Sequence, residues 1–65
     1  MKVGIAIDSW KFDIFDRHLR QGGYSYEKGD GLTEGTTLLS VYTSNLEALE
    51  RVVRAANMES SATQG

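Results

Sequence analysis

The hydrophobic pattern of this chain changes its period close to the start. From Val3 to Ile7, β-branched residues alternate with small ones, which is the two-residue period of a strand with one apolar face. In the next segment Phe12, Phe15 and Leu19 recur on one side at about 100° per residue, the period of a helix. A strand followed directly by an amphipathic helix indicates a domain in which helices pack on a sheet.

Two more strands are expected after this helix. The segment Tyr24–Lys28 alternates again and is short. Residues 29–35, "GDGLTEG", contain three glycines and two acids and are typical of a hairpin connection. Thr36–Thr43 is rich in residues that suit a pleated surface, with apolar side chains on both faces.

The sequence marks the start of the second helix more clearly than the start of the first. The first helix begins at Ser9 or nearer Asp13, and the pair at residues 22–23, Gly-Gly, can supply its C-cap. The second has Ser44 and Glu47 at capping-box spacing, followed by an apolar stripe that ends before Asn57. Its acid-before-base pairs, Glu47 with Arg51 and Glu50 with Arg54, are expected on a solvated face.

The element order β-α-β-β-α predicts an α+β fold. It matches the first five elements of the ferredoxin-like sandwich, in which a right-handed crossover lets the third strand insert between the first two. We therefore expect a truncated, two-layer version with a three-stranded antiparallel sheet of order 1-3-2 and two helices on one face. The domain is expected to cover residues 1–58, and residues 59–65 to form a flexible C-terminal tail.

The small size of the chain favours self-association. Its 65 residues contain no cysteine, so no disulfide can reinforce a small core. The first strand, "VGIAI", is predicted to have an open edge with a charge only at each end. We expect a homodimer or higher homo-oligomer; the alternative is a monomer whose edge is covered by Trp10 or the tail. The expected interface residues are Val3, Ile5, Ile7, Trp10, Leu38 and Tyr42.

Charge and composition argue against several other partners. The net charge of −2 is wrong for a nucleic-acid or anionic-membrane surface. No apolar run approaches the roughly 20 residues of a membrane span, and no signal peptide is recognisable, so a cytoplasmic location is expected. With one histidine and no thiolate, neither a structural metal nor a cofactor is expected.

Four polar residues are candidates for a small-ligand site. Asp8, Ser9 and Lys11 meet at the carboxyl end of the first strand, where α/β proteins often bind anions or small metabolites. The competing interpretation is that Asp8 and Ser9 only cap the helix. His18 is the one side chain with an ordinary pKa near neutrality, but it is expected two to three turns along the helix from Ser9. No catalytic residue is assigned.

The stretches "GIAIDSWK", "IF" and "RHL" within residues 4–19, together with "NLEAL" and "AAN" in the second helix, carry a resemblance. They are similar to a group of small bacterial, phage and environmental proteins, and this resemblance implies no assigned activity and no catalytic residues. We expect a non-catalytic homo-oligomeric interaction or ligand-binding module, such as a bacterial or phage accessory protein. The alternative is a tiny enzyme whose active site forms between subunits.

Overall fold

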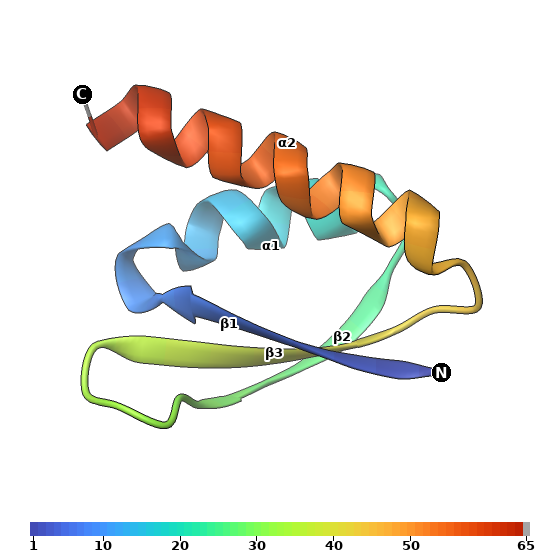
Figure 1. Ribbon diagram of the computed structural model, residues 1–65, viewed down its shortest axis with the longest axis horizontal. Coiled ribbons are helices and arrows are strands. Elements are labelled where there is room, and N and C mark those ends of the chain that lie inside the picture. Colours follow the sequence, from blue (N-terminus) through green and yellow to red (C-terminus); the bar gives the residue numbers. More distant parts are fainter. Residues whose placement is uncertain (65) are drawn as a thin grey trace.

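The computed structural model describes residues 1–64, and its helices and strands follow the predicted order (Figure 1). They are β1 (Lys2–Asp8), a short 3₁₀ turn (Ser9–Lys11), α1 (Phe12–Gln21), β2 (Ser25–Asp30), β3 (Thr36–Tyr42) and α2 (Leu46–Gln64).

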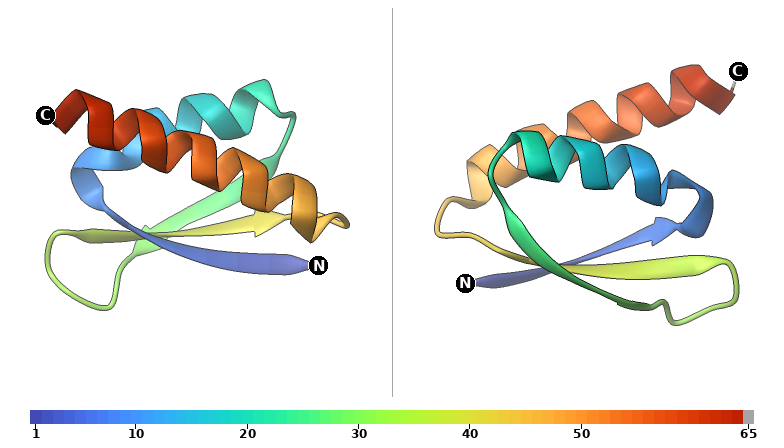
Figure 2. Two further views of the ribbon diagram at one scale, coloured as in Figure 1. Left: turned by 45° about the horizontal axis from the view of Figure 1, so that its top comes forward. Right: turned by 180° about the vertical axis from the view of Figure 1, so that it is seen from behind.

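The strands form one antiparallel sheet of order β1-β3-β2, with Ile5 opposite Leu39 and Tyr26 opposite Val41. Because β1 and β2 both run antiparallel to β3, they are parallel to each other, as a crossover through α1 requires. Both helices lie on the same face of this sheet, and the two further views show the other face uncovered (Figure 2). The predicted α+β fold, a truncated ferredoxin-like sandwich, is confirmed.

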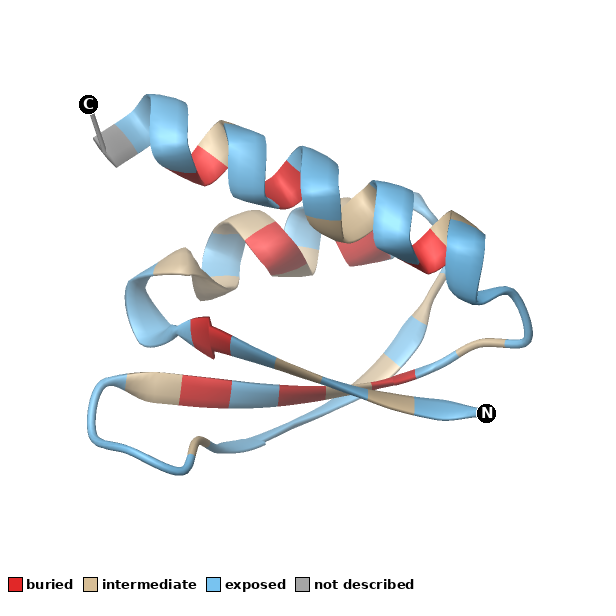
Figure 3. Ribbon diagram, in the orientation of Figure 1, coloured by how far each residue is buried: buried red, intermediate tan, exposed pale blue. Residues whose placement is uncertain are grey.

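The core lies between the sheet and the helices (Figure 3). Odd-numbered residues of β1 and β3 point toward the helices, because successive side chains of a strand alternate between its faces. Along β1 only Ile7 is fully buried, whereas Val3 and Ile5 are half-buried. The buried apolar residues are Ile7, Phe15, Leu19, Leu39, Val41, Leu49 and Ala56.

The first helix begins between the two predicted starts. Ser9–Lys11 form the 3₁₀ turn, and regular α-helix starts at Phe12. Neither Asp8 nor Lys11, which precede the two segments, uses its side chain as a cap. At the other end Gly23 takes a φ of 77°, the left-handed conformation that glycine adopts without strain and that a helix terminus favours.

The predicted capping box of α2 is wrong by one residue. The side-chain oxygen of Asn45 accepts a hydrogen bond from the backbone N–H of Ala48 at 3.1 Å. The backbone N–H of Asn45 in turn donates to the hydroxyl of Thr43 at 3.0 Å. Asparagine is as good an N-cap as serine, and the turn that leaves β3 presents Asn45, not Ser44, at that position.

The predicted tail over residues 59–65 is also wrong, because α2 continues to Gln64; Gly65 lies outside the described residues. Ser60 is 0% exposed and its hydroxyl donates to the carbonyl of Ala56 at 2.8 Å. Glu59 binds two side chains of α1, those of Arg17 and His18. The sequence predicted fraying from lost apolar periodicity, but the contacts of Glu59 hold this part of the helix on α1, and Ser60 is buried.

Candidate functional site

The outer edge of β1 has no strand beside it in the described chain, because β1 pairs only with β3. The direction of its backbone groups follows from two hydrogen bonds at its ends. Ser9 N–H donates to Gly35 at 2.8 Å, and Met1 C=O accepts from Thr43 at 2.9 Å. In an antiparallel pair such bonded residues alternate with unbonded ones. Odd-numbered residues of β1 therefore bond β3, and the N–H and C=O groups of its even-numbered residues point outward.

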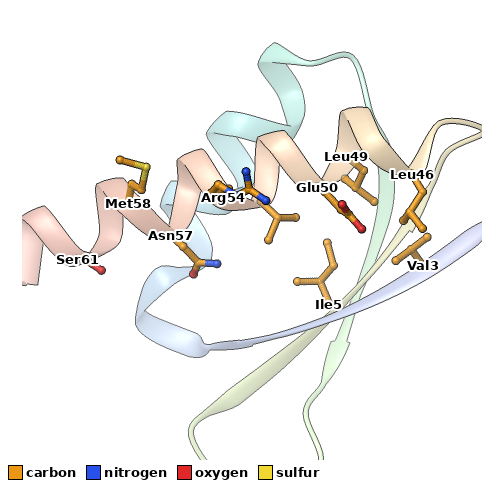
Figure 4. A pocket seen from close by; sticks show the side chains of 10 residues that line it. Val3, Ile5, Leu46, Leu49, Glu50, Arg54, Asn57, Met58 and Ser61 are labelled. Carbon is orange, nitrogen blue, oxygen red and sulfur yellow. The ribbon is translucent and has the colours of Figure 1, made fainter.

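An apolar groove runs along this open edge, between β1 and α2 (Figure 4). Its volume is about 540 Å³. The side chains of Val3 and Ile5 point from β1 toward the helix, into this open groove, and each is therefore only half-buried. The groove residues of α2 are Leu46, Leu49, Glu50, Val53, Arg54, Asn57, Met58 and Ser61.

The helix side of the groove combines apolar and charged side chains. Leu46 and Met58 are large hydrophobic residues that are 42% and 69% exposed. Glu50 and Arg54 are exposed, as expected of a solvated face, but both line the groove. Sequence periodicity missed this because it assigned them to the polar side of the helix. Glu50 follows Leu46 by four residues and Arg54 precedes Met58 by four, and residues at this spacing lie on one stripe of a helix. This spacing could have placed the two charged residues beside the apolar ones.

A smaller hollow of about 270 Å³ adjoins the groove and shares Ile5, Val53 and Asn57 with it. Asp8 and Lys11 line this hollow, and their charged groups are 3.8 Å apart. Ser9 is not among its lining residues: its hydroxyl shares a hydrogen bond of 2.8 Å with that of Thr37 on β3. The predicted ligand site is thus divided, and neither Asp8 nor Ser9 caps the helix.

His18 belongs to the contact between the two helices and does not join the other candidate ligand residues. Its Nε2 lies 2.9 Å from a carboxylate oxygen of Glu59, and Arg17 binds the other oxygen of the same carboxylate. His18 is not among the residues that line the hollows at β1. It fastens the last turns of α2 to α1. Sequence reasoning missed Glu59 because it placed this residue in the tail.

The remaining expected interface residues lie on different surfaces. Trp10 is 47% exposed and lines a hollow of about 740 Å³ between the 3₁₀ turn and the β2–β3 connection. Leu38 and Tyr42, 37% and 43% exposed, lie on the face of the sheet opposite the helices. Ile7 is in the core. Of the six expected residues, the structure therefore brings only Val3 and Ile5 together in one groove.

Two tyrosines of the sheet are hydrogen-bonded to carboxylates. Tyr42 donates to Glu27 on the open face, and this bond, with a smaller contribution from burial, raises the pKa of Tyr42 above its ordinary value. Tyr26 donates to Asp16 of α1; burial, then this bond, raises the pKa of Tyr26. Each bond ties a carboxylate to a tyrosine of the sheet.

Within residues 1–64, no group of three or more histidine or acidic side chains is placed to hold a metal ion. In the same part of the chain, neither helix combines the length and apolar character needed to cross a bilayer. Comparison with protein-family models, curated proteins and solved structures found no match to this chain. The resemblance to small bacterial, phage and environmental proteins stays a prediction.

Proposed function

We propose that this chain is a non-catalytic interaction module that works as a homo-oligomer, in its simplest form a homodimer. The observation that carries the proposal is the open edge of β1, which has a strand neighbour on one side only and borders an apolar groove on the helix side. Pairing with the same edge of a second copy supplies the missing neighbour and covers the groove in both copies.

A comparison of the two free edges of the sheet favours β1 as the strand that pairs with a second copy. The outer edge of β2 carries charged side chains at Glu27, Lys28 and Asp30, which discourage pairing with another strand. The edge of β1 carries Gly4 and Ala6 at its centre, which leave the outward backbone groups unobstructed. A second strand is therefore expected at β1, not at β2.

The size of the core supports self-association as well. Only seven apolar residues are buried among those described, and the chain has no disulfide. A domain of about 60 residues buries only ~60% of the surface of its unfolded chain, so its stability is marginal. Covering the groove residues in a dimer adds apolar burial where the single chain exposes it.

Proline substitutions distinguish a dimer that pairs through the edge of β1 from one that pairs through the edge of β2. Ala6 has an outward N–H, so Ala6→Pro removes a donor from the free edge and none from the bonds to β3. Lys28→Pro is the matched control: Gly31 N–H bonds Thr36, so odd residues of β2 bond β3 and the N–H of Lys28 also points outward. We expect light scattering after size exclusion to show a wild-type dimer, a dimer for Lys28→Pro, and dissociation of Ala6→Pro.

Circular dichroism accompanies these measurements, because a subunit that depends on its partner can unfold when it dissociates. Dissociated Ala6→Pro protein, folded or unfolded, supports the proposal when Lys28→Pro stays dimeric. A wild-type chain that is a compact monomer at micromolar concentration, or an Ala6→Pro variant that dimerises as well as the wild type, would overturn it.

We do not adopt the alternative of a small enzyme with a site between subunits, since no contact favours it. Such a site would need His18 or Asp8 to meet polar groups of the other subunit, and in this structure His18 contacts Glu59 and Asp8 contacts Lys11 of the same chain. Binding of a small ligand, a bacterial or phage accessory role and the cytoplasmic location stay predictions from the sequence.

A further inference from the structure

We propose a specific register for the interface: two copies of β1 pair antiparallel about a two-fold axis at Ile5, which sets Lys2 of each copy opposite Asp8 of the other. This inference rests on the proposed function, because it presupposes that the edge of β1 meets a second copy. It goes further by fixing which residues face each other across the interface.

The backbone limits the possible registers. Only Lys2, Gly4, Ala6 and Asp8 direct both N–H and C=O away from β3, as the bonds at Ser9 and Met1 establish. Hydrogen-bonded pairs in an antiparallel ladder must join residues of this outward set in both copies. Allowed symmetric registers therefore differ by steps of two residues. The register centred on Ile5 pairs all four outward residues, and the next one on either side pairs only three.

The charges at the ends of β1 select the same register. Lys2 and Asp8 point to the helix-free side and are both exposed, and the register at Ile5 places them opposite each other twice in the dimer. Directly opposite charges on neighbouring strands stabilise pairing, and like charges oppose it. Asp8 contacts Lys11 at 3.8 Å, but its side chain is 56% exposed and can accept from a second donor. A shift of two residues leaves Lys2 opposite a residue without charge.

On the helix side, this register brings apolar residues together. Ile5 of one copy lies opposite Ile5 of the other, and Val3 lies opposite Ile7 of the other copy. Directly opposite residues share a face, so the axis is perpendicular to the sheet and both helical layers lie on one side of a six-stranded sheet. The two α2 helices then approach antiparallel above the joined strands, where Glu50 of one copy can meet Arg54 of the other.

Single cysteines test the register directly, because the chain has none of its own. Ile5 is at a non-hydrogen-bonded position, where opposite Cα atoms are about 4.5 Å apart, close enough for a disulfide. We expect Ile5→Cys to form a disulfide-linked dimer under mild oxidation. Val3→Cys alone, the matched control, should stay unlinked, whereas a mixture of Val3→Cys with Ile7→Cys should give the mixed, linked dimer.

Charge reversal gives a second test that needs no covalent bond. Lys2→Glu and Asp8→Lys each place like charges opposite each other, and each is expected to weaken self-association about tenfold. In a mixture of the two variants, all four charges of a heterodimer are complementary. Native mass spectrometry should therefore show the heterodimer in excess over the statistical half.

The outcomes separate this inference from the proposed function. A dimer that Ala6→Pro dissociates, but that shows no link at residue 5 and no heterodimer excess, supports pairing at β1 and overturns the register. A compact wild-type monomer overturns both. A linked Ile5→Cys dimer, with Val3→Cys unlinked and the charge variants preferring each other, supports both.

Discussion

The first turn of α2 depends on one side-chain amide. Asn45 accepts from Ala48 N–H, while Ser44, the residue that the sequence favoured, precedes the cap. We expect Asn45→Ala to lower the free energy of unfolding by about 1 kcal/mol, the usual cost of losing an N-cap. Ser44→Ala, its matched control, should change it by less than about 0.5 kcal/mol. Urea denaturation of both variants measures the difference; an equal loss for the two would contradict the assignment of the cap.

A second residue-scale prediction concerns acid stability. Hydrogen bonds from Tyr26 and then Arg20 hold the pKa of Asp16 below its ordinary value of 3.8. Because the folded-state pKa is the lower one, the stability from this carboxylate is complete above 3.8 and is lost as the pH falls through the folded value. NMR titration should show the Asp16 pKa rising toward its ordinary value both in Tyr26→Phe and in Arg20→Gln. An unchanged pKa in Tyr26→Phe would contradict the contact.

At the scale of the element, the end of α2 can be tested with two small residues. Ser60 is buried and Ala62 is exposed outside the groove, yet both would be exposed in a flexible tail. Ser60→Asp forces a charge into a closed contact and is expected to cost about 2–4 kcal/mol of unfolding free energy. Ala62→Asp should cost less than about 1 kcal/mol, most of it the lower helix propensity of aspartate. Thermal denaturation of both variants provides the measurement, and similar midpoints would show that residue 60 is not packed.

The elements differ in how far the sequence could predict them. The period of β1 and the apolar arc of α1 gave the right faces, because these segments follow local rules of alternation and helical spacing. The last turns of α2 follow no such rule: Glu59 is held by contacts with α1 that only the folded chain creates, and Ser60 is buried beside it in the sequence. The groove was missed for the same reason, since the sequence does not show that the stripe with Glu50 lies beside the edge of β1.

At the scale of the whole molecule, the open edge and the small core have the same cause. In a six-element ferredoxin-like sandwich, another strand follows the second helix and would lie beside β1. Here the residues after Met58 extend the helix as far as Gln64 instead. The described chain therefore supplies three strands and no cover for the groove. In the dimer that we propose, β1 of a second copy takes the place of that strand in each subunit.

This view predicts that stability depends on protein concentration. If the dimer unfolds to two free chains, dilution favours unfolding by mass action, whereas the midpoint of a monomer does not change. With an unfolding enthalpy of roughly 0.7 kcal/mol per residue over both chains, a tenfold dilution should lower the midpoint by about 5 °C. Calorimetry over a hundredfold range of concentration tests this for the wild type and for Lys28→Pro, which should behave alike. Folded Ala6→Pro protein should have a midpoint that is lower and independent of concentration. A wild-type midpoint that does not change on dilution would contradict the proposed dimer.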